Sequence, residues 1–85
     1  MQESEAKTHL TVYYRVGCHL CDEMTALLCE FQDELKFTFG LVDIDADADL
    51  NVRFNADVPV VAWGERILFR HFFDEAILRQ ALQHG

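Results

Sequence analysis

The chain has 85 residues, of which 51% are hydrophobic and 26% are charged, and its formal net charge is −8. This length fits one domain with one hydrophobic core, and the composition excludes a disordered chain. Nucleic-acid binding is disfavoured because it depends on Lys and Arg neutralising phosphates, and no apolar run approaches the ~20 residues of a membrane-spanning helix.

We expect residues 1–9 to form a flexible N-terminal segment and residues 10–85 to form a single domain. The first seven residues are polar, with Glu3 and Glu5 where a secretory signal would carry basic residues, and no apolar stretch follows them. A cytoplasmic monomer without membrane or nucleic-acid partners is therefore expected. In that reducing compartment a Cys-x-x-Cys pair is more often catalytic, redox-active or metal-binding than structural.

Strand-forming residues fill positions 10–16 and are apolar on both faces, which is typical of a central strand covered by helices. Gly17 ends this strand, and Cys18 and Cys21 follow at the predicted start of a helix. Over residues 20–35, apolar side chains recur at spacings of three and four, which predicts an amphipathic helix. The two cysteines then share one face within reach of a disulfide, although the same spacing also begins many zinc sites.

The remaining residues predict alternating short elements. Residues 37–44 read as a second strand, which would make a right-handed βαβ unit with parallel strands. Residues 45–54 predict a short helix capped by Asp45 or Asp47. After a break, residues 60–63 and 66–70 predict a hairpin with a glycine in its turn, and a final helix over residues 74–83 is capped by Asp74.

The predicted order β-α-β-α-β-β-α, with a Cys-x-x-Cys after the first strand and a Val-Pro before the third, is that of the minimal thioredoxin fold. The segments YYRVGCHLCDE (13–23) and DVPVV (57–61) resemble the small bacterial glutaredoxin-like proteins, and the resemblance extends over residues 10–82. It implies an α/β protein with a four-stranded mixed sheet flanked by helices. It also implies a dithiol–disulfide oxidoreductase that reduces protein disulfides or mixed disulfides.

Cys18 is the predicted nucleophile, because unpaired N–H groups and the positive dipole end at a helix start favour a thiolate. Asp22 and Glu23 lie in the same turn and act against this effect. Cys21, one turn deeper and expected to face the sheet, is the predicted resolving thiol. Cys18 would attack a substrate disulfide, and Cys21 would then release the reduced substrate and leave a Cys18–Cys21 bridge.

The resemblance also implies where a substrate binds. Val58-Pro59 is expected to be a cis peptide beside the cysteines, with the backbone of Val58 pairing with an extended peptide. Arg15 stands three positions before the first cysteine, where glutaredoxins carry a lysine or arginine for a glutathione carboxylate. Glutathione would then be a co-substrate, with no tightly bound cofactor, and protein or small-molecule disulfides would be the partners.

The sequence departs from the glutaredoxin pattern at Phe72-Phe73, where glutaredoxins have a Gly-Gly turn, so the reductant stays open between glutathione and a protein dithiol. We expect both rings to lie in the core, although an exposed pair would suit a protein partner. Cys29 is interpreted as a buried, small apolar side chain rather than a regulatory thiol.

Two alternatives to an enzyme remain at this stage. One is a non-catalytic thioredoxin-fold binding module, and the other is a carrier of a metal or an iron–sulfur cluster. No second Cys-x-x-Cys or spaced His pair completes four zinc ligands, so we predict no metal site.

Overall fold

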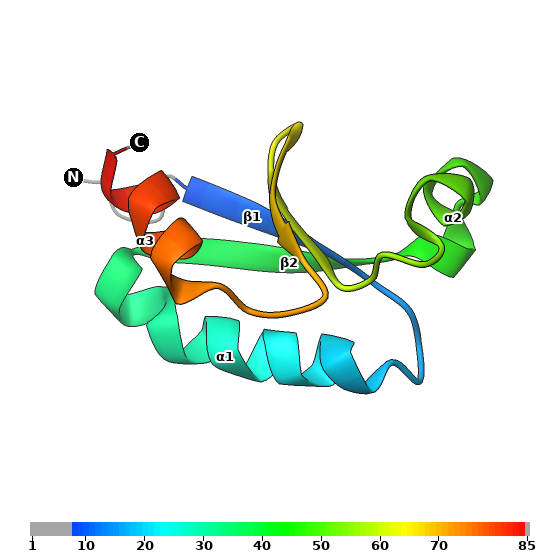
Figure 1. Cartoon of the computed structure of the whole chain (residues 1–85), viewed down its shortest axis with the longest axis horizontal. Coiled ribbons are helices and arrows are strands. Elements are labelled where there is room, and N and C mark those ends of the chain that lie inside the picture. The colour runs from blue at the N-terminus through cyan, green and yellow to red at the C-terminus, as the bar shows by residue number, and fades with distance from the viewer. Residues whose placement is uncertain (1–7, 85) are drawn as a thin grey trace.

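The computed structural model describes residues 8–84, and its elements follow the predicted order (Figure 1). The strands and helices are β1 (Thr8–Tyr14), α1 (His19–Leu35), β2 (Phe37–Asp43), the 3-10 helix η1 (Ile44–Ala46), α2 (Ala48–Phe54), β3 (Val60–Trp63), β4 (Arg66–Arg70) and α3 (Glu75–His84). None of the helices within this range has the length and hydropathy needed to cross a lipid bilayer.

The first strand differs most from its predicted range, because β1 begins and ends two residues earlier than the sequence suggested. Thr8 and His9 belong to the sheet, while Arg15 and Val16 follow it in a turn. Residues 1–7 of the predicted flexible segment lie outside the described residues.

The four strands form one mixed sheet, as the resemblance implied, and their order in the sheet is β2-β1-β3-β4. Strand β1 pairs in parallel with β2 and antiparallel with β3, so that Val12 lies opposite both Leu41 and Val61. The hairpin of β3 and β4 is antiparallel with an irregularity between Val61 and Ala62. Because β1 is an inner strand, its carboxyl end delivers the chain to α1 from the middle of the sheet.

Helices α1 and α3 cover one face of this sheet and share one hydrophobic core with it. Met24 and Leu28 of α1 are at most 1% exposed, and each such side chain stabilises the fold by about 1.5–3 kcal/mol. The other buried members of the cluster are Leu10, Val12, Phe37, Val61, Leu68, Phe69, Leu78 and Ala81. The apolar stripe of α1 therefore fixes the rotation of this helix against the sheet, and with it the direction of every side chain in its first turn.

A second, smaller cluster of Ile44, Phe54 and Val60 holds η1 and α2 at one end of the sheet (Figure 1). Tyr13 stacks on Phe54 with ring centroids 4.6 Å apart. The Asp47 carboxylate caps α2 by accepting hydrogen bonds from the first backbone N–H groups, which confirms one of the two caps expected. This packing brings η1 and α2 beside the turn that follows β1.

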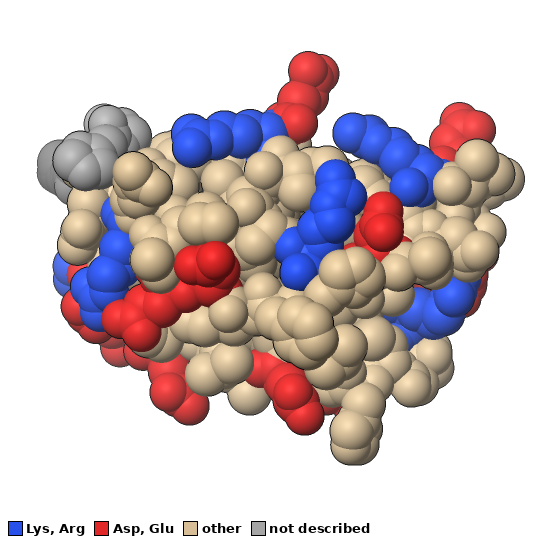
Figure 2. Space-filling model, in the orientation of Figure 1, with Lys and Arg blue, Asp and Glu red and all other residues tan. Residues whose placement is uncertain are grey.

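Charge is distributed unevenly over the surface (Figure 2). Helix α1 carries five carboxylates and no Lys or Arg, namely Asp22, Glu23, Glu30, Asp33 and Glu34, all of them exposed. Two of these carboxylates, Asp22 and Glu23, directly follow Cys21 in the sequence.

Candidate active site

Cys18 and Cys21 are bonded as a disulfide, with their Cα atoms 5.2 Å apart. Cys18 is the N-cap residue of α1, with an extended backbone, and its sulfur accepts a hydrogen bond from the N–H of Cys21 at 3.1 Å. The sulfur of Cys18 thus lies against the N–H groups at the start of the helix, where a thiolate formed on reduction is stabilised.

The two sulfurs differ in their access to solvent. Cys21 is 1% exposed and continues the buried stripe of Met24 and Leu28, whereas Cys18 is partly exposed. A bulky disulfide outside the protein can therefore reach Cys18 first. Cys21 can reach a sulfur only when that sulfur is bonded to Cys18.

A tight turn aims Cys18 at the helix start. The N–H of Cys18 donates to the carbonyl of Arg15 at 3.2 Å, and Gly17 between them has a φ of 83°. Only glycine enters this left-handed region without a steric penalty, so Gly17 lets the chain leave β1 and enter α1 within a few residues.

The Val58-Pro59 peptide bond is cis, and Pro59 is buried. It precedes β3, whose Val60 lies opposite Tyr13 of β1, so this peptide and the Cys18 turn lie at the same end of the inner strands. The carbonyl of Pro59 accepts a hydrogen bond from the N–H of His71 at 2.8 Å. This bond ties the segment after β4 to the cis peptide.

The structure places the Arg15 guanidinium in a network with η1 and the end of α2. Its Nε and Nη2 donate to the two carboxylate oxygens of Asp45 at 3.0 and 3.2 Å. Nη2 also donates to Oδ1 of Asn55 at 2.7 Å, and Nη1 to the Asn55 carbonyl at 3.4 Å. A carboxylate of a substrate would have to compete with Asp45 and Asn55 for the guanidinium. Neither the local spacing of residues nor the hydrophobic pattern could reveal these two partners of Arg15.

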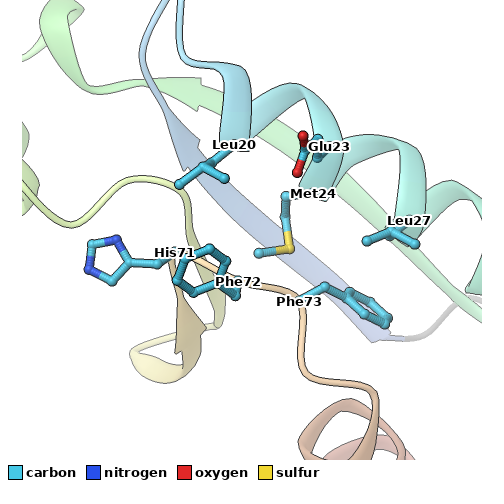
Figure 3. A pocket seen from close by; sticks show the side chains of 7 residues that line it. All are labelled: Leu20, Glu23, Met24, Leu27, His71, Phe72 and Phe73. Carbon is cyan, nitrogen blue, oxygen red and sulfur yellow. The ribbon is translucent and has the colours of Figure 1, made fainter.

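A groove of about 260 Å³ lies between α1 and the segment that follows β4 (Figure 3). Its lining residues are Leu20, Glu23, Met24, Leu27, His71, Phe72 and Phe73. Phe73 packs on Phe31 and Phe69 at the edge of the core, with ring centroids 5.1 and 5.9 Å away, whereas Phe72 is 68% exposed. The expectation that both rings lie in the core is therefore right for Phe73, which packs against the core cluster, and wrong for Phe72, whose ring lies outside that packing.

That turn is made by His71 rather than by glycine. His71 has a φ of 68°, and the N–H of Phe72 donates to the carbonyl of Arg70 at 2.7 Å. Asp57 accepts a hydrogen bond from Arg70 at 3.3 Å and lies 3.9 Å from Nε2 of His71. The hydrogen bond to the Pro59 carbonyl and the nearby Asp57 carboxylate together hold His71 in a left-handed backbone conformation that would otherwise favour glycine.

Cys29 is exposed, and the expectation that it is buried is wrong. Eight residues of helix turn Cys29 about 80° away from Cys21, which moves it off the stripe that faces the sheet. Elsewhere among the side chains of residues 8–83, no group of three His, Cys, Asp or Glu converges in a way that could hold a metal ion.

Comparison with known proteins gives a consistent picture. The family model of the glutaredoxin-like domain (DUF836) matches residues 9–83. The solution structure of protein Ne2328 from Nitrosomonas europaea is 33% identical, with a TM-score of 0.83 over 96% of this chain and 99% of that one. No match is found among the curated proteins.

Two further solved structures extend the comparison. A structural-genomics target protein from X. campestris is 32% identical, with a TM-score of 0.66 over 89% of this chain and 97% of that one. Thioredoxin from Fasciola hepatica is 15% identical, with a TM-score of 0.56 over 94% of this chain and 82% of that one, a likeness of fold alone. The expected minimal thioredoxin fold is thereby confirmed.

Proposed function

The chain belongs to the glutaredoxin-like domain family, and we propose that it is a dithiol–disulfide oxidoreductase that reduces protein disulfides or mixed disulfides. The observation that carries the proposal is the Cys18–Cys21 pair at the N-terminus of α1, with one sulfur accessible and the other buried. This difference in exposure suits Cys18 as the thiol that attacks the substrate and Cys21 as the thiol that resolves the mixed disulfide.

In the reduced protein the Cys18 thiolate attacks one sulfur of a substrate disulfide. A Cys18–substrate bond forms, the substrate S–S bond breaks, and the departing thiolate takes a proton from water. Cys21, having lost its proton, then attacks the sulfur of Cys18 and expels the second substrate thiolate. The substrate gains two electrons and two protons, and the protein is left with the Cys18–Cys21 disulfide seen in the structure.

A thiol reductant must then return two electrons to the pair, and we assign this role to glutathione or a protein dithiol without any tightly bound cofactor. A reducing cytosol supplies both classes, and a monomer suffices because both cysteines come from one chain.

On the substrate side, we propose that the backbone of Val58 beside Pro59 pairs with an extended segment. Arg15 contributes to binding a substrate carboxylate only when its guanidinium releases Asp45 and Asn55 and binds that carboxylate instead.

A single-turnover experiment tests the proposal without depending on the reductant. Pre-reduced protein is mixed with an equimolar model peptide disulfide, and free peptide thiol and protein disulfide are followed by mass spectrometry. We expect one Cys18–Cys21 disulfide for each peptide disulfide reduced, and accumulation of the mixed disulfide in Cys21→Ser. Cys29→Ser is the matched control and should react like the wild type, whereas full activity of Cys18→Ser would show that the assignment is wrong.

A further inference from the structure

We propose that the groove between α1 and residues 71–73 selects the substrate by binding an apolar side chain that neighbours a Lys or Arg, on an extended segment flanking the reacting cysteine. This inference rests on the proposed function and specifies the substrate class of the same site. Basic, partly apolar protein segments are then preferred over small anionic disulfides such as those of glutathione.

The walls of the groove are mostly apolar. Figure 3 shows Leu20, Met24 and Leu27 projecting from α1 toward the segment that carries Phe72 and Phe73. The volume of about 260 Å³ is smaller than the ~300–1,000 Å³ typical of small-molecule sites. The space is therefore suited to one side chain of a longer ligand.

The groove begins in the part of α1 that carries the cysteine pair. Leu20 stands between Cys18 and Cys21 in the sequence and lines the groove, and Met24, which also lines it, lies one helical turn after Cys21. An extended peptide whose cysteine is bonded to Cys18 is therefore within a few residues of the groove. This proximity distinguishes the groove from an apolar patch elsewhere on the surface.

The charges around the groove favour a basic neighbour. Glu23 lines it, Asp22 precedes Glu23, and α1 contributes no Lys or Arg. Among the side chains that the structure describes, no ion pair involves either of these two carboxylates, whereas Arg15 and Arg70 are both paired with aspartates. Opposite charge on a ligand would therefore be attracted and like charge repelled, most strongly at low salt.

Phe72 is the exposed member of the lining. It is 68% exposed, and the left-handed backbone of His71 precedes it. An aromatic ring that stays in water in the free protein and becomes covered on binding is a typical anchor of a protein interface. Its burial by a substrate side chain would add affinity without demanding a change in the core.

The test uses four reagents, each a thiol activated as its mixed disulfide with thionitrobenzoate: three short peptides and glutathione. The peptides place Leu and Lys, Leu and Glu, or Ser and Lys beside the cysteine. Pre-reduced protein carrying Cys29→Ser, which removes the exposed third thiol, is mixed with each reagent, and the rate of thionitrobenzoate release is measured. We expect the Leu-Lys peptide to react fastest, about three- to tenfold faster than the Leu-Glu peptide and the glutathione reagent at low salt.

Variants assign the selectivity to the groove. Because Glu23 also opposes the Cys18 thiolate, its effect is read from the ratio of rates between peptides. Glu23→Gln should lower the ratio of the Leu-Lys rate to the Leu-Glu rate about two- to fivefold, and Glu23→Lys should reverse the order of these two peptides. Phe72→Ser should slow the two leucine peptides about five- to tenfold and the serine peptide less than twofold. The controls are Glu65→Gln in the exposed β3–β4 turn and Val52→Ser, at an 83% exposed position on α2, and neither should change the order.

Equal rates for all four reagents, or a preference for glutathione, would overturn the inference while leaving the proposed function intact. If sedimentation shows that the wild type is a dimer and Phe72→Ser a monomer, while the selectivity is unchanged, the groove binds a second copy of the chain instead. If no reagent reacts faster with the wild type than with Cys18→Ser, the proposed function itself is wrong.

Discussion

Replacing Arg15 by Lys removes the planar fork that binds Asp45 and Asn55 while keeping the positive charge. Lys can make one of these contacts at a time, because its ammonium group is a point charge. The turn from Arg15 to Cys18 begins at this residue, so the network joins the cysteine-bearing turn to η1 and α2. We expect the substitution to destabilise the protein and not only to alter substrate binding.

The magnitude follows from geometry and exposure. Arg15 and Asp45 side chains are 33% and 46% exposed, so solvent screens their ion pair to about 0.2–1 kcal/mol. The short hydrogen bond to Oδ1 of Asn55 adds about 0.5–1.5 kcal/mol. We therefore expect Arg15→Lys to lower the free energy of unfolding by about 1–2 kcal/mol, which is roughly 4–16 °C in melting temperature for a domain of this size.

Urea denaturation of Arg15→Lys, Asp45→Asn and the double variant measures this effect and the coupling between the two residues. We expect a coupling energy of about 0.5–1 kcal/mol, since the carboxylate and the guanidinium are in direct contact. Arg66→Lys, an exposed arginine of β4, is the matched control and should stay within about 0.5 kcal/mol of the wild type.

Two results would refute the reasoning. If Arg15→Lys is as stable as Arg66→Lys, the hydrogen bonds around Arg15 do not stabilise the fold. If both single substitutions destabilise the protein but their effects add without coupling, Arg15 and Asp45 act independently, and the turn before Cys18 is not held by their contact.

Two further predictions concern helix α1. Nη1 of Arg79 donates a hydrogen bond to Oε2 of Glu34 at 2.7 Å and holds the pKa of that carboxyl below its usual value of 4.5. Their pair therefore stabilises the fold above pH 4.5, and this contribution is lost as the pH falls through the lowered pKa. Above pH 4.5 the melting temperature of the wild type should therefore exceed that of Glu34→Gln, and the difference should disappear at lower pH. A difference in melting temperature that persists in acid would contradict this prediction. Leu28→Ala should cost about 2–5 kcal/mol in urea unfolding because Leu28 is fully buried, whereas Cys29→Ser, at the next position, should change stability by less than about 0.5 kcal/mol.

The position of the cysteine pair could be predicted from local sequence patterns. The apolar stripe at Met24 and Leu28 predicts which side of α1 faces the sheet, and Cys21 follows from it by helical spacing. Asp47 and Asp74 predict helix starts because a side-chain oxygen there can satisfy backbone N–H groups that the helix leaves free.

What the sequence could not provide are contacts between distant segments. Asp45 lies 30 residues from Arg15 and Asn55 lies 40 away, so no spacing rule connects them. The end of β1 was placed two residues late because Val16 is a strong strand former, yet its side chain is 75% exposed in the turn. His71 was missed because a left-handed backbone at a residue other than glycine has no reliable signal in a single sequence.

The strand order has a consequence for how this sheet meets other chains. The two outer strands are β4 and β2. Strand β4 begins and ends with the exposed charges of Arg66 and Arg70, which oppose the addition of another strand. Strand β2 carries one charge, Asp43 at its end, and its Leu41 is 51% exposed. Edge-to-edge association at high concentration is therefore expected along β2, and a lysine in place of Leu41 would be the substitution to prevent it.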